Sequence, residues 1–182
     1  MKNATIAKKM YYCALNYFDA CEKLRHNLLN DNNPSIIYPL MYLERHTLEL
    51  LLKSIILFSV KKQNIIEDLK VIINDGSAFD LSRTHSLLIL INKYIEINAN
   101  NFLFPNFDEK VIKDIRKQLE IWDKFDSDSL VNINFKNIYI MVDQNNEVLH
   151  ILKNVDLQSL KYINILYDNC LYFLEQLSNM VK

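Results

Sequence analysis

The chain has 182 residues, 50% of them hydrophobic, which fits one domain with a sizeable core and argues against intrinsic disorder. Its 21 basic and 22 acidic side chains give a formal charge of −1, so no overall positive field attracts nucleic acid. One glycine and three prolines leave few breaks, which favours long helices over a sheet with many turns. We therefore expect a single, mostly α-helical domain over residues 1–182.

The first sixty residues predict a long antiparallel pair of helices. Apolar side chains recur every three or four positions from about Thr5 to about Leu29, with Thr5 as the N-cap. A second helix begins between residues 35 and 39 and extends to about Val60. Its second half is apolar over most of the circumference, which is the pattern of a central, buried helix.

The middle of the chain predicts shorter helices. The apolar pattern of Ile65–Ile73 predicts a short helix that ends at Gly76, the only glycine. Thr84 is expected to cap the next helix, and Asp108 the one after it. Each of these helices has an inward face of apolar residues.

The segment before the last helix changes to a period of two. Val131–Leu152 contains alternating β-branched residues around turn-forming residues, which predicts a small antiparallel β-hairpin. Asp156 is expected to cap a last helix that closes the bundle. The expected fold is thus a mostly α bundle of five to six helices with this hairpin before the last one.

A narrow row of polar side chains runs along the second helix. At about 100° per residue, the row lies within one arc of the helix surface. One interpretation is a solvated face or a buried ion network that fixes the helix orientation. The other is a polar pocket, in which Arg45 and His46 act on a substrate and the other members bind it. The members of the row are Tyr42, Arg45, His46, Glu49 and Lys53.

His85 begins the next long helix, where it could face this row or act only as a capping residue. Convergence of Arg45, His46 and His85 would supply a cation, a general acid and a general base. That combination is what metal-independent RNA cleavage requires. Of the other two histidines, His26 is expected to favour the end of the first helix, and His150 to lie in the hairpin.

Other kinds of site are disfavoured. The sequence has no CxxC, HExxH, Walker A, GxGxxG or GxSxG motif, so we expect neither a metal nor a cofactor. Cys13, Cys21 and Cys170 are odd in number and are expected to be free core thiols in a reducing cytosol. No apolar run approaches the roughly 20 residues that a membrane span needs, so we expect a soluble cytoplasmic protein without a membrane partner.

Two stretches carry a resemblance to a known family. RHTLELLLKSI, which begins at Arg45, and the later THSLLIL, which contains His85, resemble the HEPN superfamily of small prokaryotic helical domains. The resemblance implies a helical bundle, commonly a homodimer, from a toxin–antitoxin, abortive-infection or other phage-defence system. HEPN ribonucleases usually carry an arginine followed by a histidine after four to six residues, and no arginine here is so followed. Only the matched positions are therefore candidates: Arg45, His46, Glu49, Lys53 and His85.

Two functions follow as hypotheses. The first is a HEPN-like protein of a bacterial or phage conflict system, acting as a metal-independent endoribonuclease or as an RNA- or nucleotide-binding protein. The alternative is a non-catalytic protein-interaction module, such as an immunity protein, an antitoxin or an inhibitor. An exposed aromatic loop at residues 101–107 would favour the alternative, because it would offer a surface to a protein partner.

Overall fold

The structure is a computed structural model that describes residues 2–31, 36–60, 65–67, 69–73, 76–99, 108–127 and 157–181. Within these ranges the chain is mostly α-helical, as the sequence predicts. The predicted hairpin at Val131–Leu152, the aromatic loop at 101–107, Asp156 and His150 lie outside the described residues. The described helices are α1 (Lys2–Asp31), α2 (Ile37–Ser59), α3 (Leu87–Ala99), α4 (Glu109–Ser127) and α5 (Leu157–Val181).

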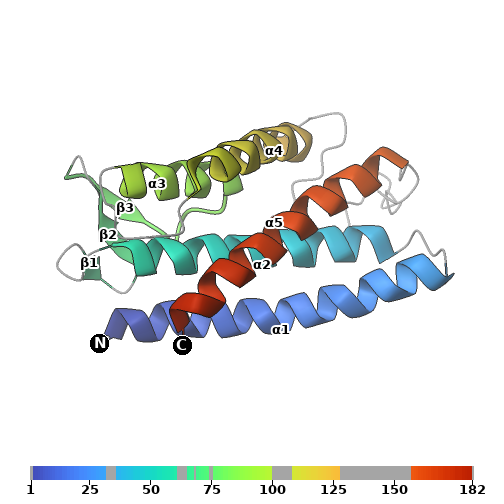
Figure 1. Ribbon diagram of the computed structural model, residues 1–182, viewed down its shortest axis with the longest axis horizontal. Helices are drawn as coiled ribbons and strands as arrows, with labels where there is room; N and C mark the ends of the chain where they lie inside the picture. Colours follow the sequence, from blue (N-terminus) through green and yellow to red (C-terminus); the bar gives the residue numbers. More distant parts are fainter. Residues whose placement is uncertain are drawn as a thin grey trace, which may run out of the picture.

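Helix α2 is the centre of the bundle, which confirms its predicted place. It packs against α1, α3 and α5. In Figure 1, α1 runs along one side of α2, α3 and α4 lie on the other side, and α5 crosses it obliquely. Most apolar side chains of its second half are nearly or fully buried, including Leu48, Leu51, Leu52, Ile55 and Ile56.

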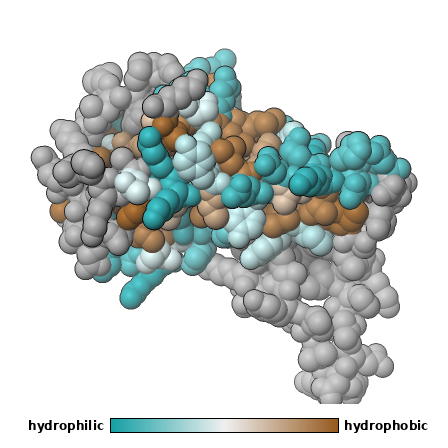
Figure 2. Space-filling view, turned by 90° about the horizontal axis from the view of Figure 1, so that it is seen from below, coloured by the Kyte–Doolittle hydropathy of each residue, from teal (hydrophilic) through white to brown (hydrophobic). Residues whose placement is uncertain are grey.

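Small side chains let α1 and α2 approach each other closely. Ala7 and Ala14 on α1 are fully buried, and the Ser54 hydroxyl on α2 donates a 2.8 Å hydrogen bond to the carbonyl oxygen of Ala7. Helix α1 begins at Lys2, so Thr5 lies inside the helix and its predicted role as N-cap is wrong. On the face seen in Figure 2, from the side on which α1 lies in Figure 1, hydrophobic side chains reach the surface between groups of hydrophilic ones.

The predicted helix at Ile65–Ile73 is wrong, because this stretch forms part of a small antiparallel sheet. The strands β1 (Ile65–Glu67), β2 (Lys70–Ile72) and β3 (Ala78–Asp80) pair in the order β1-β2-β3. Gly76 lies in the turn between β2 and β3 with φ +81°, a left-handed conformation that suits glycine. The run of isoleucines is short and β-branched, and such runs pack well in strands.

The predicted N-cap of α3 is wrong, and the predicted N-cap of α4 is confirmed. Ser86, not Thr84, caps α3, because its hydroxyl oxygen accepts the N–H of Ile89 at 3.2 Å. Thr84 instead donates to the carbonyl oxygen of Asp80 at 2.8 Å, which ties the loop before α3 to β3. The Asp108 carboxylate accepts backbone N–H groups of the first turn of α4, as predicted.

The cysteines are free thiols in the structure. Cys21 and Cys170 are buried, as predicted, whereas Cys13 is exposed on α1, so its placement in the core is wrong. None of the described helices is both long and apolar enough to cross a lipid bilayer.

Candidate functional site around His85

Three charged side chains on α2 form one continuous chain of contacts. They are one helical turn apart, so they stack along the same face. The Lys53 ammonium donates to Glu49 Oε1 at 2.7 Å, and Arg45 Nη1 donates to Glu49 Oε2 at 3.1 Å. Both oxygens of Glu49 are therefore engaged by cations of its own helix.

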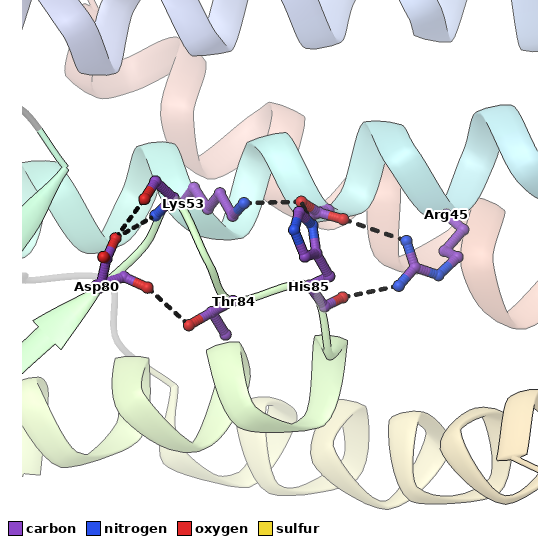
Figure 3. A network of polar contacts seen from close by, with 7 residues as sticks. Arg45, Lys53, Asp80, Thr84 and His85 are labelled. Carbon is purple, nitrogen blue, oxygen red and sulfur yellow. Dashed lines mark hydrogen bonds and ion pairs between the residues drawn. The ribbon is translucent and has the colours of Figure 1, made fainter. Parts of the chain in front are cut away.

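His85 joins this chain from the loop between β3 and α3 (Figure 3). Its Nδ1 lies 3.0 Å from Glu49 Oε1, and its backbone carbonyl oxygen accepts Arg45 Nη2 at 2.7 Å. Both the ring and the main chain of His85 are thus attached to α2. We call Arg45, Glu49, Lys53 and His85 the Glu49 cluster.

The Glu49 cluster is buried except at His85. The side chains of Arg45, Glu49 and Lys53 are 6%, 5% and 7% exposed, whereas that of His85 is 44% exposed. Burial alone would raise the pKa of Glu49, but the contacts with Lys53, Arg45 and His85 outweigh it and lower the pKa. Glu49 is therefore a carboxylate at neutral pH, and two cations against this one anion leave the cluster with a formal charge of +1 when His85 is neutral.

An ionised carboxylate can only accept hydrogen bonds, so the Nδ1 of His85 carries the proton that faces Glu49. The other ring nitrogen, Nε2, is then the one available for proton transfer when the ring is neutral. A carboxylate that orients a histidine in this way is a common arrangement in general acid–base catalysis.

The loop that presents His85 is held by its own hydrogen bonds. The Asp80 carboxylate accepts the backbone N–H of Ser82 at 2.9 Å, and Thr84 is bonded to the main chain of Asp80. Arg83 lies between Ser82 and Thr84 in this loop, and its side chain is 88% exposed, with a 3.5 Å contact to Asp80. An exposed cation therefore lies two residues from the exposed imidazole.

The structure does not bring His46 into the Glu49 cluster. Its ring packs perpendicular to the ring of Tyr17, with 4.9 Å between the ring centroids and 87° between the ring planes. It lies parallel to the ring of Tyr42. Arg45 is buried and bonded to Glu49 and to His85. The predicted convergence of Arg45 with both histidines is thus realised for His85 alone, and Tyr42 is likewise outside the cluster.

A second buried polar cluster was missed from the sequence. Glu44 on α2 is fully buried, and its Oε1 accepts Arg25 Nε of α1 at 3.2 Å. Arg25 also donates to Asn164 of α5 and lies over the Tyr167 ring, 3.8 Å from its centroid. Burial raises the pKa of Glu44 to about 8 in spite of Arg25, so this carboxyl is largely protonated at neutral pH.

A signal for Glu44 was present in the sequence. It lies four residues after Leu40 and four before Leu48, both of which are fully buried, so it belongs to the apolar face of α2. An acidic residue in that phase is a candidate for a buried, protonated acid.

His26 is the remaining histidine among the described residues. His26 is exposed near the end of α1 and shares a 2.8 Å hydrogen bond with Asn30. No group of three His, Cys, Asp or Glu side chains that could hold a metal ion occurs among the described residues.

Comparison with protein-family models, curated proteins and solved structures gives no match for this chain.

Proposed function

We propose that this chain is a HEPN-like protein of a bacterial or phage conflict system that binds RNA or a nucleotide at the loop around His85. The observation that carries the proposal is the exposed imidazole of His85 fixed to a buried carboxylate within a positively charged cluster. Fixing an exposed side chain at a buried ion cluster is costly in entropy and desolvation, which a purely structural loop does not require.

The chemistry around His85 fits a phosphodiester. The cluster carries a formal charge of +1, and the exposed Arg83 adds a cation on the same loop. Arginine and imidazole groups are frequent partners of phosphate oxygens. The net charge of the whole chain is only −1, so the rest of the molecule does not strongly repel a phosphodiester that approaches this local positive charge.

Cleavage of RNA is the stronger form of the proposal. A base removes the proton of the 2′-hydroxyl, the oxygen attacks phosphorus, and an acid protonates the departing 5′-oxygen. We assign one of these proton transfers to His85, because its side chain is 44% exposed and its Nδ1 is held by Glu49. We assign no proton transfer to His46, because its ring packs against Tyr17, and we therefore favour RNA or nucleotide binding with a single acid–base group.

The direct test compares two histidine variants. Labelled tRNA and total-RNA fragments are titrated with wild-type protein, His85→Ala and His26→Ala in EDTA, and retention on a filter gives the affinity. His26 is the matched control, because it is exposed and has one side-chain partner on its own helix. We expect His85→Ala to bind about tenfold more weakly, the loss of one charge-assisted contact, and His26→Ala to bind like the wild type.

The same samples, run on a denaturing gel, test cleavage. Cleavage in EDTA that disappears in His85→Ala supports the ribonuclease form. Binding that depends on His85 without cleavage supports the binding form. Equal binding by all three proteins, or no binding by the wild type, would rule out the role of the His85 loop.

The second candidate is a non-catalytic protein-interaction module. It is favoured because the two buried cations, Arg45 and Lys53, already donate hydrogen bonds to Glu49 within the protein. Large hydrophobic side chains on α3 and α4, Ile89 and Ile121, are exposed and could meet a second copy or another protein. Light scattering of wild type, Ile89→Asp and Ile121→Asp tests the expected homodimer, which these charges should dissociate.

A further inference from the structure

The residue at which α3 begins decides whether His85 belongs to the loop or to the helix. Thr84 and Ser86 flank His85 at this point, and serine and threonine are both common N-caps. A helix capped by Ser86 leaves His85 outside. A helix capped by Thr84 would include His85 as its first residue, and the His85 carbonyl oxygen would then accept the N–H of Ile89.

In the structure Ser86 is the cap. Its carbonyl oxygen accepts the N–H of Leu90 at 3.1 Å, and its hydroxyl oxygen accepts the N–H of Ile89 at 3.2 Å. The same hydroxyl donates to Asp123 Oδ1 of α4 at 3.3 Å. Both the donor and the acceptor of this hydroxyl are therefore engaged, and α4 helps to fix its orientation.

This cap leaves the carbonyl oxygen of His85 to Arg45. The oxygen accepts Arg45 Nη2 at 2.7 Å, while the N–H of Ile89 is bonded to the Ser86 hydroxyl instead (Figure 3). Carbonyl groups within a helix are directed along its axis, so in a longer α3 this oxygen would be directed toward Ile89. Such a turn of the backbone would also displace the His85 ring, whose Nδ1 lies 3.0 Å from Glu49 Oε1.

Thr84 is the alternative cap. Its hydroxyl donates to the carbonyl oxygen of Asp80 at 2.8 Å, which holds the loop on β3. A hydroxyl that donates can still accept, so Thr84 can begin the helix when the Ser86 hydroxyl is removed. The two possible caps thus correspond to two positions of His85.

We propose that Ser86 is the positioning residue of His85, because its cap starts α3 just after the histidine and so leaves the His85 carbonyl oxygen to Arg45 and the ring to Glu49. Ser86 was not among the candidates from the sequence. The inference rests on the proposed function for its effect on RNA binding, whereas the position of His85 can be measured without RNA.

The experiment compares isotope-labelled wild type, Ser86→Ala and Ser86→Thr by NMR, without RNA and at a pH at which the His85 ring is neutral. The ¹³Cα signal of His85 reports whether the residue is helical, and the ¹⁵N signals of its ring report which nitrogen carries the proton. We expect a non-helical His85 with the proton on Nδ1 in the wild type. Ser86→Ala should move the ¹³Cα signal toward the helical value and bring the two ¹⁵N signals closer together. Ser86→Thr keeps the hydroxyl and should restore the wild-type signals.

Asp108→Ala is the matched control. Asp108 caps α4 through two backbone N–H groups, at 2.9 and 3.2 Å, so this variant loses a cap of the same kind elsewhere. It should leave the His85 signals unchanged, which separates the position of His85 from a general loss of stability. In filter binding of RNA, Ser86→Ala should bind up to about tenfold more weakly, the loss expected for His85→Ala, and Asp108→Ala should bind like the wild type.

The outcomes distinguish this inference from the proposed function. Unchanged His85 signals in Ser86→Ala would overturn the inference, whatever the RNA measurement gives. Equal changes in Ser86→Thr or Asp108→Ala would overturn it as well, because the hydroxyl of this cap would then not be the cause. Signals displaced in Ser86→Ala alone, together with RNA binding that is equal in all variants or absent, would support the positioning role and refute the proposed function.

Discussion

Glu49 is the residue on which the candidate site depends. Its two oxygens accept hydrogen bonds from Arg45, Lys53 and His85, which come from α2 and from the loop before α3. Charges as deeply buried as these are tolerated only when they are paired. The same carboxylate is therefore the counter-charge of the buried cations and the group that orients the imidazole of His85.

Replacing Glu49 by glutamine tests the structural part. The substitution keeps the shape but leaves two buried cations without a counter-charge, so we expect a loss of about 3–5 kcal/mol in the free energy of unfolding. Glu109→Gln is the control, because Glu109 pairs with Lys113 on the exposed side of α4, and surface pairs contribute below about 1 kcal/mol. Urea unfolding at pH 7 measures both. A similar small loss in the two variants would show that the Glu49 cluster is not stabilised as an ion network.

At the scale of elements, three helices meet at Glu44. Arg25 of α1 and Cys170 of α5 both contact this residue of α2, the thiol donating to its carbonyl oxygen at 3.4 Å. From α1, Glu22 and Cys21 also act on this region, and from α5, Asp168 does so. A proton on the Glu44 carboxyl therefore stabilises the junction of all three helices.

The pH dependence of stability follows from this raised pKa. Between the ordinary value of 4.5 and about 8, the folded protein holds a proton on Glu44 that the unfolded chain has released. Stability should fall as pH rises through that window, by at most about 1.4 kcal/mol per pH unit from this group. Glu44→Gln should show a flatter profile in urea unfolding from pH 5 to pH 9, while Glu175→Gln, exposed on α5, should follow the wild type. Parallel profiles for wild type and Glu44→Gln would refute a protonated Glu44.

Helices with a long, periodic apolar pattern were predictable from the sequence, whereas the short elements were not. Helix α2 was found from its apolar circumference, and its turn-by-turn spacing joined Arg45, Glu49 and Lys53 correctly. Ile65–Ile73 was wrong, because a short apolar run satisfies a strand as well as a helix. Thr84 was wrong as a cap, because either of two hydroxyls two residues apart could start α3.

At the scale of the whole molecule, neighbours decide what a helix face does. A helix projection places His46 with Arg45 and Glu49, but α1 packs beside that edge and its Tyr17 holds the His46 ring. The projection also places Glu44 on the apolar side of α2, but it does not show that Arg25 of α1 contacts Glu44 there. Which residues share a helix face can be read from one sequence, whereas the partner on the next helix requires the fold.

The most direct test of the His85 loop is histidine NMR on the whole protein. Imidazole signals of His85 and His26 are assigned from the spectra of His85→Ala and His26→Ala, and a short single-stranded RNA is then added in EDTA. We predict that the His85 signals shift until the RNA is saturating while those of His26 stay in place, because only His85 belongs to the Glu49 cluster. RNA that binds to the protein without moving the His85 signals would contradict the account.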